Sequence, residues 1–321
     1  MNSAHASIDI GSNTLRLLIA QPSIDPLAIQ PWKIINYTHR ITRLGQGLHK
    51  SGKLSKAGIE RTLDALKEFR HLINQHEVQA HSIFAVATAA VREAENGSFF
   101  KQLIQQKTGI NVSIISGEEE ASRSLLGAAS VLHDETRNDM LLFDIGGGST
   151  EFIRAKEGAI IDAISCKLAV VRLVEAHLHS DPPSKDDYMA MKKTTRDHLA
   201  KVSAFWEKTS PPAPARMVGT AGTVTTLAAV HMELTPYDPQ KVNNHRIARE
   251  AFYQLRNRLL AMNHHQRESI PAIEVGRADL IIAGLAIIDV IMEKWNYDSF
   301  ITVDAGLLEG NWINSYESES K

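Results

Sequence analysis

Three segments place glycine directly after an apolar run and before Ser or Thr: residues 9–14 (DIGSNT), 144–150 (DIGGGST) and 219–223 (GTAGT). Glycine adopts backbone conformations that other residues avoid, so it lets a ligand approach the backbone closely. Consecutive N–H groups in such a turn form a concave anion site, to which Ser and Thr hydroxyls add donors. The pattern predicts phosphate-binding loops, although for any one loop the alternative is a tight hairpin that needs glycine.

The candidate phosphate-binding residues of these loops either carry a polar side chain or carry none: Ser12, Asn13, Gly146, Gly147, Gly148, Ser149, Thr150, Gly222 and Thr223. A Walker loop does not explain them, because GxxxxGK[ST] is absent and the glycines at 146–148 lead into another strand-like run. A Rossmann dinucleotide site is also disfavoured, since no GxGxxG lies between a strand and a helix.

Two aspartates, Asp9 and Asp144, each end an apolar run immediately before a glycine loop. A carboxylate in such a place is costly to bury unless it is paired or bound to a metal ion. Mg²⁺ prefers a few carboxylates together with waters and substrate phosphate oxygens. We therefore predict that both aspartates are Mg²⁺ ligands; the alternative is that each caps its own turn.

Residues 116–122 (SGEEEAS) contain three consecutive acids, which cannot share one role because successive helix residues point about 100° apart. Ser116 and Glu119 have the spacing of a capping box, which gives Glu119 a structural role. Glu118 would lie in the first helical turn, where negative charge is favourable. Glu120 is left as the candidate general base that activates water, the alternative being a merely acidic helix start.

Positive charge is concentrated in two places. Arg92 follows a buried strand expected at 82–88 and could bind phosphate oxygens in a bidentate way; alternatively it pairs with Glu93 or Glu95. Residues 38–56 contain no acid, and they could guide a polyanion or form a solvated loop. The basic residues of this stretch are Arg40, Arg43, Lys50, Lys53 and Lys56.

The bulk composition is that of an ordinary globular chain of 321 residues, about two domains, with 43% hydrophobic and 22% charged residues. A net charge of −2 argues against a dedicated nucleic-acid or membrane-surface binder. The single cysteine, Cys166, excludes an intrachain disulfide, and no signal peptide is visible. The apolar run 280–292 is short for a bilayer and contains Asp289, so we expect a buried helix and a cytoplasmic location.

The elements that must position these residues alternate between strands and helices. Strands are expected at 6–10, 15–20, 82–88, 110–115, 140–145, 150–155 and 300–304. Helices are expected at 55–71, 99–109, 117–132, 184–206, 245–261, 276–294 and 307–315. Residues 216–230 are expected to run from a strand through the GTAGT loop into a helix. A proline-rich connector is expected at 209–215. The echo of residues 9–14 in residues 144–150 indicates a duplicated domain, each half beginning on a similar hairpin.

Taken together, the motifs resemble the exopolyphosphatase/guanosine pentaphosphate phosphatase (Ppx/GppA) family in its short two-domain form, a branch of the actin, Hsp70 and sugar-kinase superfold. The segments that carry the resemblance span nearly the whole chain: 9–20, 43–48, 87–97, 115–122, 143–152, 218–229, 276–288 and 303–310. One departure is Leu308, which stands where the family often has arginine in GLREG.

The resemblance implies an α/β fold with two ribonuclease-H-like domains that flank an active-site cleft. One would comprise residues 1–126 plus about 306–321, and the other residues 127–305. It implies that Glu120 is the catalytic glutamate and that Arg92 contacts phosphate. It also assigns Asp9, Ser12 and Asn13 to a first phosphate loop, and Asp144, residues 146–150 and Glu151 to a second. Arg16 and Arg277 lie in family segments and are further candidates.

The expected activity is Mg²⁺-dependent hydrolysis of terminal phosphoanhydride bonds in polyphosphate or guanosine pentaphosphate, with water activated by Glu120 and assisted by Glu151. A homodimer is a further expectation, and neither nucleic acid nor membrane is an expected partner. One alternative is an ATP-dependent small-molecule kinase of the same superfold. Another is a non-catalytic sensor that only binds such anions.

Overall fold

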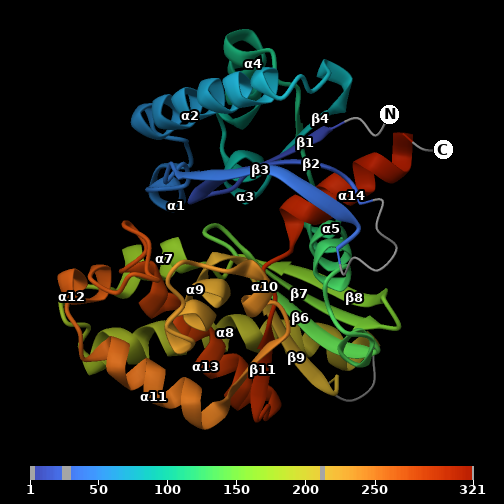
Figure 1. The fold of residues 1–321 in the computed structure, drawn as a ribbon. Helices are drawn as coiled ribbons and strands as arrows, with labels where there is room; N and C mark the ends of the chain where they lie inside the picture. The colour runs from blue at the N-terminus through green and yellow to red at the C-terminus, as the bar shows by residue number, and fades with distance from the viewer. Residues whose placement is uncertain (1–3, 24–29, 210–213, 320–321) are drawn as a thin grey trace. The chain divides into compact units, whose positions relative to one another are not determined.

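The chain divides into two units, each built around its own β-sheet (Figure 1). In this computed structural model the described residues are 4–23, 30–209 and 214–319. The first unit comprises Met1–Val131 with Ala305–Lys321, and the second comprises Leu132–Asp304. Most of the proline-rich connector expected at 209–215 lies outside the described residues.

The sheet of the first unit has the order β3-β2-β1-β4-β5, in which β1, β2 and β3 are antiparallel neighbours and β4 and β5 run parallel to β1. Its strands are β1 (His5–Ile10), β2 (Thr14–Pro22), β3 (Trp32–Ile41), β4 (Ile83–Ala87) and β5 (Val112–Ile114). This is the strand order of ribonuclease-H-like domains. Every residue of β1 is buried, so the first loop is attached to the most protected part of the sheet.

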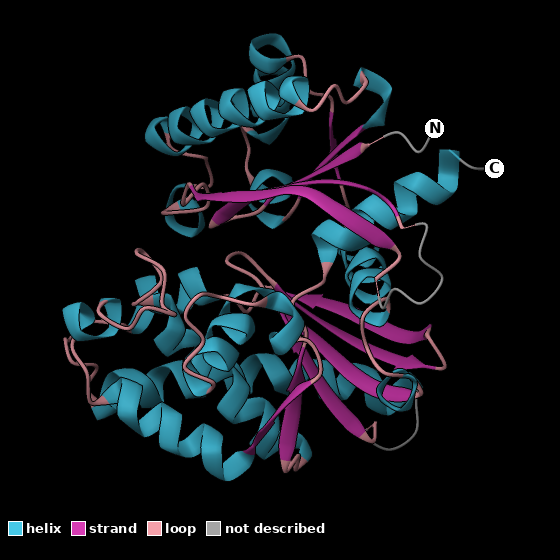
Figure 2. Ribbon diagram, viewed as in Figure 1, coloured by secondary structure: helices cyan, strands magenta, loops and turns pink. Residues whose placement is uncertain are grey.

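Helices cover the sheet of the first unit on both faces (Figure 2). They are α1 (Leu48–Ser51), α2 (Lys56–Gln75), η1 (Ala80–Ser82), α3 (Ala89–Glu93), α4 (Gly97–Thr108), α5 (Gly117–Ala129) and α14 (Leu307–Glu319). α2 begins at Ser55, whose hydroxyl accepts from Gly58 N, and α4 ends at Gly109 in the left-handed conformation. α14 packs on α5 and β1. Leu308 is buried there, which suits leucine better than the arginine common in the family.

The sheet of the second unit repeats this order as β8-β7-β6-β9-β11 and adds β10 at one edge. Its strands are β6 (Asp139–Ile145), β7 (Thr150–Lys156), β8 (Ala159–Cys166), β9 (Arg216–Thr220), β10 (His245–Ala248) and β11 (Ser299–Thr302). β6 pairs antiparallel with β7 and parallel with β9, as β1 does with β2 and β4. The predicted fold class is therefore confirmed, and the shared order supports the hypothesis of a duplicated domain.

The helices of the second unit are α6 (Asp134–Arg137), α7 (Val170–His177), α8 (Lys185–Thr209), α9 (Ala221–His231), α10 (Pro239–Val242), α11 (Arg249–Leu260), α12 (His264–Glu268) and α13 (Leu280–Trp295). Of these, α7, α8, α9 and α11 pack on the apolar helix α13 (Figure 1). The apolar run at 280–292 is thus a buried helix, as predicted. Its one carboxylate, Asp289, accepts from Tyr188, Lys192 and Arg256, which offsets the cost of burying it. Across the described ranges, no helix is long and apolar enough to cross a membrane.

The structure differs from the sequence-based expectations in several places. Strands β3 and β8 form where no strand was expected. The helix expected at 245–261 begins with strand β10, because residues 245–248 pair with β11 and this pairing outweighs local helical preference. GTAGT is not a loop, since β9 runs to Thr220 and α9 starts at Ala221. The first unit extends to Val131 rather than 126, because α5 continues to Ala129.

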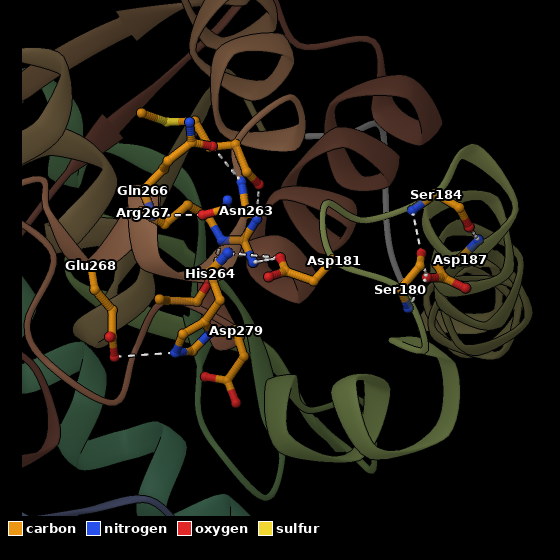
Figure 3. Close-up of polar contacts among 12 residues, drawn as sticks. Ser180, Asp181, Ser184, Asp187, Asn263, His264, Gln266, Arg267, Glu268 and Asp279 are labelled. Carbon is orange, nitrogen blue, oxygen red and sulfur yellow. Dashed lines mark hydrogen bonds and ion pairs between the residues drawn. The ribbon is translucent and has the colours of Figure 1, made fainter.

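The start of α8 shows how a local polar network fixes a long helix. Ser184 Oγ accepts from Asp187 N at 3.1 Å, as the capping spacing predicts. The Asp187 carboxylate turns instead to Ser180, whose N–H and hydroxyl both donate to it, and it also accepts from His179 N (Figure 3). Burial opposes the charged form, but these hydrogen bonds outweigh it and lower the pKa of Asp187.

A lowered carboxyl pKa contributes stability that is present above the unfolded pKa, about 3.9, and is lost as pH falls through the folded value. We expect Asp187→Asn to lower the free energy of unfolding at pH 7 by about 1 kcal/mol, because a neutral amide is a weaker acceptor. The difference from wild type should narrow below about pH 4. Urea unfolding from pH 7 downward measures this, with Asp186→Asn, exposed on the same helix turn, as the control. A difference that does not change with pH would contradict the assignment.

Candidate functional site

The two Asp-Ile-Gly loops have the same backbone geometry. Gly11 N donates to Thr14 O at 3.1 Å, and Gly146 N donates to Ser149 O at 2.9 Å. A Cβ on either glycine would lie 2.9 Å from that same carbonyl oxygen, closer than real side chains come. The echo in the sequence therefore corresponds to one turn built twice, and glycine is required in both copies.

Hydrogen bonds from residues 42–45 fix the backbone of the first loop, and the Ser12 hydroxyl is available to a ligand. The Asn13 carbonyl accepts from Thr42 N and Arg43 N at 3.0 and 2.9 Å, and the Ser12 carbonyl accepts from Gly45 N at 2.7 Å. Ser12 is only 4% exposed. Its Oγ forms no hydrogen bond with any other residue that the structure describes, so this hydroxyl can donate to a bound anion.

Two of the predicted site residues meet directly in the first unit. Arg92 Nη1, at the end of α3, donates to Glu120 Oε2 at 3.0 Å and to Ile115 O at 2.8 Å. The expected alternative, a pair with Glu93 or Glu95, is not the contact formed here; Glu95 lies 3.4 Å from Lys53. The two side chains are 25% and 9% exposed, so the ion pair is partly screened from water.

The orientation of Arg92 leaves most of its donors for a ligand. Both hydrogen bonds use Nη1, and within the described part of the chain Nε and Nη2 contact no acceptor. These N–H groups form the edge of the guanidinium that matches two oxygens of one phosphate. The hydrogen bonds to Glu120 and Ile115 thus orient the guanidinium so that its Nε and Nη2 groups are available to a ligand.

The three acids of SGEEEAS separate as predicted. Ser116 Oγ accepts from Glu119 N at 3.1 Å, and Glu119 Oε2 accepts from Ser116 N at 2.8 Å, which completes the capping box. Glu118 is exposed in the first turn, whereas Glu120 is buried beside Arg92. Glu120, the acid without a capping role, is therefore the one that contacts Arg92, the candidate phosphate-binding residue.

The second loop is held by the segment that follows β8. Thr150 Oγ1 donates to Leu168 O at 2.6 Å, so its hydroxyl proton is already used and its role is to hold the loop. Gly146 O accepts from Val170 N, and Gly148 O accepts from Arg172 Nε at 3.2 Å. Ser149 Oγ has no hydrogen-bond partner among the described residues, like Ser12 Oγ. Sequence reasoning missed Arg172, because no motif marks it and only the fold brings it to the loop.

The strand pairs beside the two loops carry different charges. Asp144 lies directly opposite Glu151 in the β6–β7 register, whereas Asp9 lies opposite Arg16 in the β1–β2 register. Directly opposed residues project from the same face with Cβ atoms about 5 Å apart. Glu151 is buried and its Oε1 accepts from Ser165 Oγ at 2.7 Å. The second unit therefore pairs two carboxylates where the first pairs a carboxylate with a guanidinium.

The carboxylates fit a metal ion that is shared with a substrate. Among the described residues, no group of three or more His, Cys, Asp or Glu side chains could hold a metal by itself. Mg²⁺ commonly uses one or two carboxylates and takes its other oxygens from phosphate and water. Within the second unit, Asp144 and Glu151 are two neighbouring carboxylates with that chemistry. Asp9 is a single carboxylate of the first unit, beside Arg16.

The GTAGT segment places Arg277 against the start of α9. A Cβ on Gly222 would lie 2.0 Å from Arg277 Nη1, so glycine makes the room that the guanidinium occupies. Ala221 has φ 71, a conformation that costs a non-glycine residue about 1–3 kcal/mol. Thr223 is mostly buried, with its methyl group against Gly284. These contacts bring three further candidates together within the second unit.

Comparison with known proteins gives consistent matches over the whole chain. The model of the Ppx/GppA phosphatase family matches residues 24–319. Exopolyphosphatase 2 of Mycobacterium tuberculosis is 31% identical over 315 residues, which cover 95% of this chain and 96% of that protein. A bifunctional 3-dehydroquinate synthase/phosphatase of Fusobacterium nucleatum is 29% identical over 321 residues, 99% of this chain, and the chain spans 47% of that protein's length.

Solved structures show the same fold. The Aquifex aeolicus member of the Ppx/GppA family has a TM-score of 0.81 and 31% identity, covering 99% of both chains. An exopolyphosphatase from Cytophaga hutchinsonii has a TM-score of 0.87 and 25% identity, covering 98% of this chain and 97% of that one.

The hydrogen bonds of Arg92 require more donors than the ammonium group of a lysine can supply. Arg92→Lys keeps the charge but cannot donate to Glu120 and Ile115 while presenting two further donors. We expect affinity for tripolyphosphate to fall about tenfold or more, the loss of one to two charge-assisted hydrogen bonds. Isothermal titration calorimetry measures this, with Arg40→Lys, an exposed partner of Glu68, as the control. Equal affinities for wild type and Arg92→Lys would exclude Arg92 from the anion site.

Proposed function

The chain belongs to the Ppx/GppA phosphatase family, and we propose that it hydrolyses the terminal phosphoanhydride bond of inorganic polyphosphate, of guanosine pentaphosphate, or of both. The observation that carries this proposal is the Arg92–Glu120 pair beside the first glycine loop. It combines a candidate base for water with a donor edge for phosphate in one unit. The exopolyphosphatases among the relatives support polyphosphate as the substrate class.

In the proposed reaction, Arg92 and the Ser12 hydroxyl bind oxygens of the terminal phosphate. Glu120 accepts a proton from a water molecule as the water oxygen forms a bond to the terminal phosphorus. The bond from that phosphorus to the bridging oxygen breaks, and the shortened chain leaves with the bonding electrons. Donors aimed at the oxygens that gain charge supply most of the acceleration in phosphoryl transfer.

The second unit has phosphate donors and carboxylates of its own. We assign the backbone N–H groups of Gly147 and Gly148 and the Ser149 hydroxyl to phosphate binding, with Arg172 and Thr150 fixing the loop. Arg277 and the start of α9 are assigned to a further phosphate or to the nucleoside part of a nucleotide substrate. Mg²⁺, held by Asp144 with Glu151 in the second unit or by Asp9 in the first, would neutralise part of the phosphate charge when bound.

Glu120→Gln tests the role of the base, because it removes proton acceptance but keeps the size and one hydrogen-bond acceptor of residue 120. We expect phosphate release to fall by about 10²–10⁴-fold, the usual contribution of a general base. Tripolyphosphate binding should be largely kept. Glu118→Gln, exposed on the same helix turn, is the matched control and should retain full activity. Unchanged turnover in Glu120→Gln would show that Glu120 is not the general base.

A substrate panel tests the activity itself. Phosphate release is measured from polyphosphates of several lengths and from guanosine pentaphosphate, with and without Mg²⁺. We expect release from at least one of these substrates and a strong dependence on Mg²⁺. ATP consumption that requires a second small-molecule acceptor would favour a kinase instead. Tight binding with no release from any substrate would favour a sensor.

A further inference from the structure

The three side chains that we assign to the reaction in the first unit come from three different elements. Ser12 follows β1, Arg92 lies on α3 directly after β4, and Glu120 lies in the first turn of α5. β1 and β4 pair directly in the sheet, with Ile10 opposite Ala87, which sets the places of the first two side chains. α5 is not part of the sheet, so the place of the third depends on what holds this helix.

α5 packs on the C-terminal helix α14, and the two backbones are in direct contact (Figure 1). A Cβ on Gly310 would lie 1.7 Å from Arg123 O, and a Cβ on Gly127 would lie 2.0 Å from Gly306 O. Both distances are far shorter than real contacts of a Cβ atom, so neither glycine tolerates a side chain. α14 thus lies as close to α5 as the backbones allow.

The side chain of Asn311 on α14 is bonded to three other elements at once, and the residue is only 2% exposed. Its Oδ1 accepts from Arg123 Nη1 on α5 at 2.9 Å. Its Nδ2 donates to Ser7 Oγ on β1 at 2.9 Å and to Phe84 O on β4 at 3.0 Å. Each of these three elements carries, or leads into, one of the side chains that we assign to the reaction.

The partners of Asn311 allow only one orientation of its amide. A guanidinium only donates and a backbone carbonyl only accepts, so the amide oxygen faces Arg123 and the amide nitrogen faces Phe84. Ser7 Oγ fits the same orientation, because it gives its own proton to Leu308 O at 2.8 Å and accepts from the amide. Removing the amide would therefore leave several buried polar groups without their partner, which is costly.

Arg123 continues this connection to the start of α5. Its Nη2 lies 3.7 Å from Glu119 Oε1, and the Glu119 carboxylate closes the capping box with Ser116. The side chain of Arg123 is 18% exposed, so these contacts replace much of its hydration. Glu120 follows Glu119 directly. The turn that carries it is thus connected to both strands through Arg123 and Asn311.

We propose that Asn311 is a positioning residue for the proposed reaction: it fixes α5 against β1 and β4 and so places Glu120 beside Arg92. This inference rests on the proposed function. Asn311 contacts neither the phosphate nor the water in that reaction and acts through Arg123. Because Ser12 and Arg92 are placed by the pairing of β1 with β4, the loss of Asn311 affects the base more than phosphate binding.

Asn311→Leu keeps the size of the side chain and removes its three hydrogen bonds. We expect kcat for tripolyphosphate to fall about 10–100-fold, the effect of misplacing a reacting group by about 1 Å, while KM changes much less. Arg123→Met, which leaves α14 unchanged, should also lower kcat. Arg123→Lys should recover part of kcat, because an ammonium group can still donate to Asn311 Oδ1.

Ser315→Ala is the matched control. Ser315 is buried on the same helix, and its Oγ donates to Asn311 O at 2.7 Å. The structure shows no hydrogen bond from its side chain to β1, β4 or α5 within the described residues. We expect this variant to lower the melting temperature and to keep kcat. A loss of kcat in Ser315→Ala equal to that in Asn311→Leu would show that any weakening of α14 has the same effect, and would overturn the inference.

Two readouts distinguish this inference from the proposed function. Phosphate release by wild type decides whether the chain is a hydrolase of these substrates. Crystal structures of Asn311→Leu and Arg123→Met decide the placement of Glu120 whether or not turnover occurs. We expect the contact from Arg92 Nη1 to Glu120 Oε2, 3.0 Å in the wild-type structure, to lengthen beyond hydrogen-bond distance in both variants. An unchanged contact in both variants overturns the inference.

Discussion

The ion pair between Arg92 and Glu120 is the interaction on which the proposed chemistry of the first unit depends, and the sheet makes it possible. β4 leads into α3 with Arg92, and β5 leads into α5 with Glu120. These strands are parallel neighbours, with Ala87 opposite Ile114, and Ile115 N donates to Ala87 O at 3.1 Å. Because parallel strands bring their carboxyl ends to one edge, residues 28 positions apart meet at 3.0 Å.

The second unit repeats the architecture with different charges. Both hairpins use the same glycine turn, yet Asp9 faces Arg16 while Asp144 faces Glu151. A carboxylate beside a guanidinium is already partly neutralised, whereas two neighbouring carboxylates favour a cation between them. The duplicated frame thus carries a similar glycine turn in both units, and the paired carboxylates of the second unit are the better fit to the proposed metal ion.

Sequence reasoning succeeded where the signal is local. The capping box at Ser116, the glycine hairpins and the buried helix α13 depend on residues a few positions apart. It failed where the structure depends on strand pairing or on contacts between distant residues. Examples are strand β10, which was expected to be helical, and the pairing of Arg92 with Glu120.

We propose that Arg92 presents phosphate to a water molecule held by Glu120, and a crystal structure of Glu120→Gln with tripolyphosphate bound tests this arrangement directly. We expect a terminal phosphate whose oxygens accept from Arg92 Nε and Nη2 and from Ser12 Oγ. We also expect a water molecule between residue 120 and the terminal phosphorus. A tripolyphosphate bound away from Arg92 and Ser12 would rule out this role for both residues.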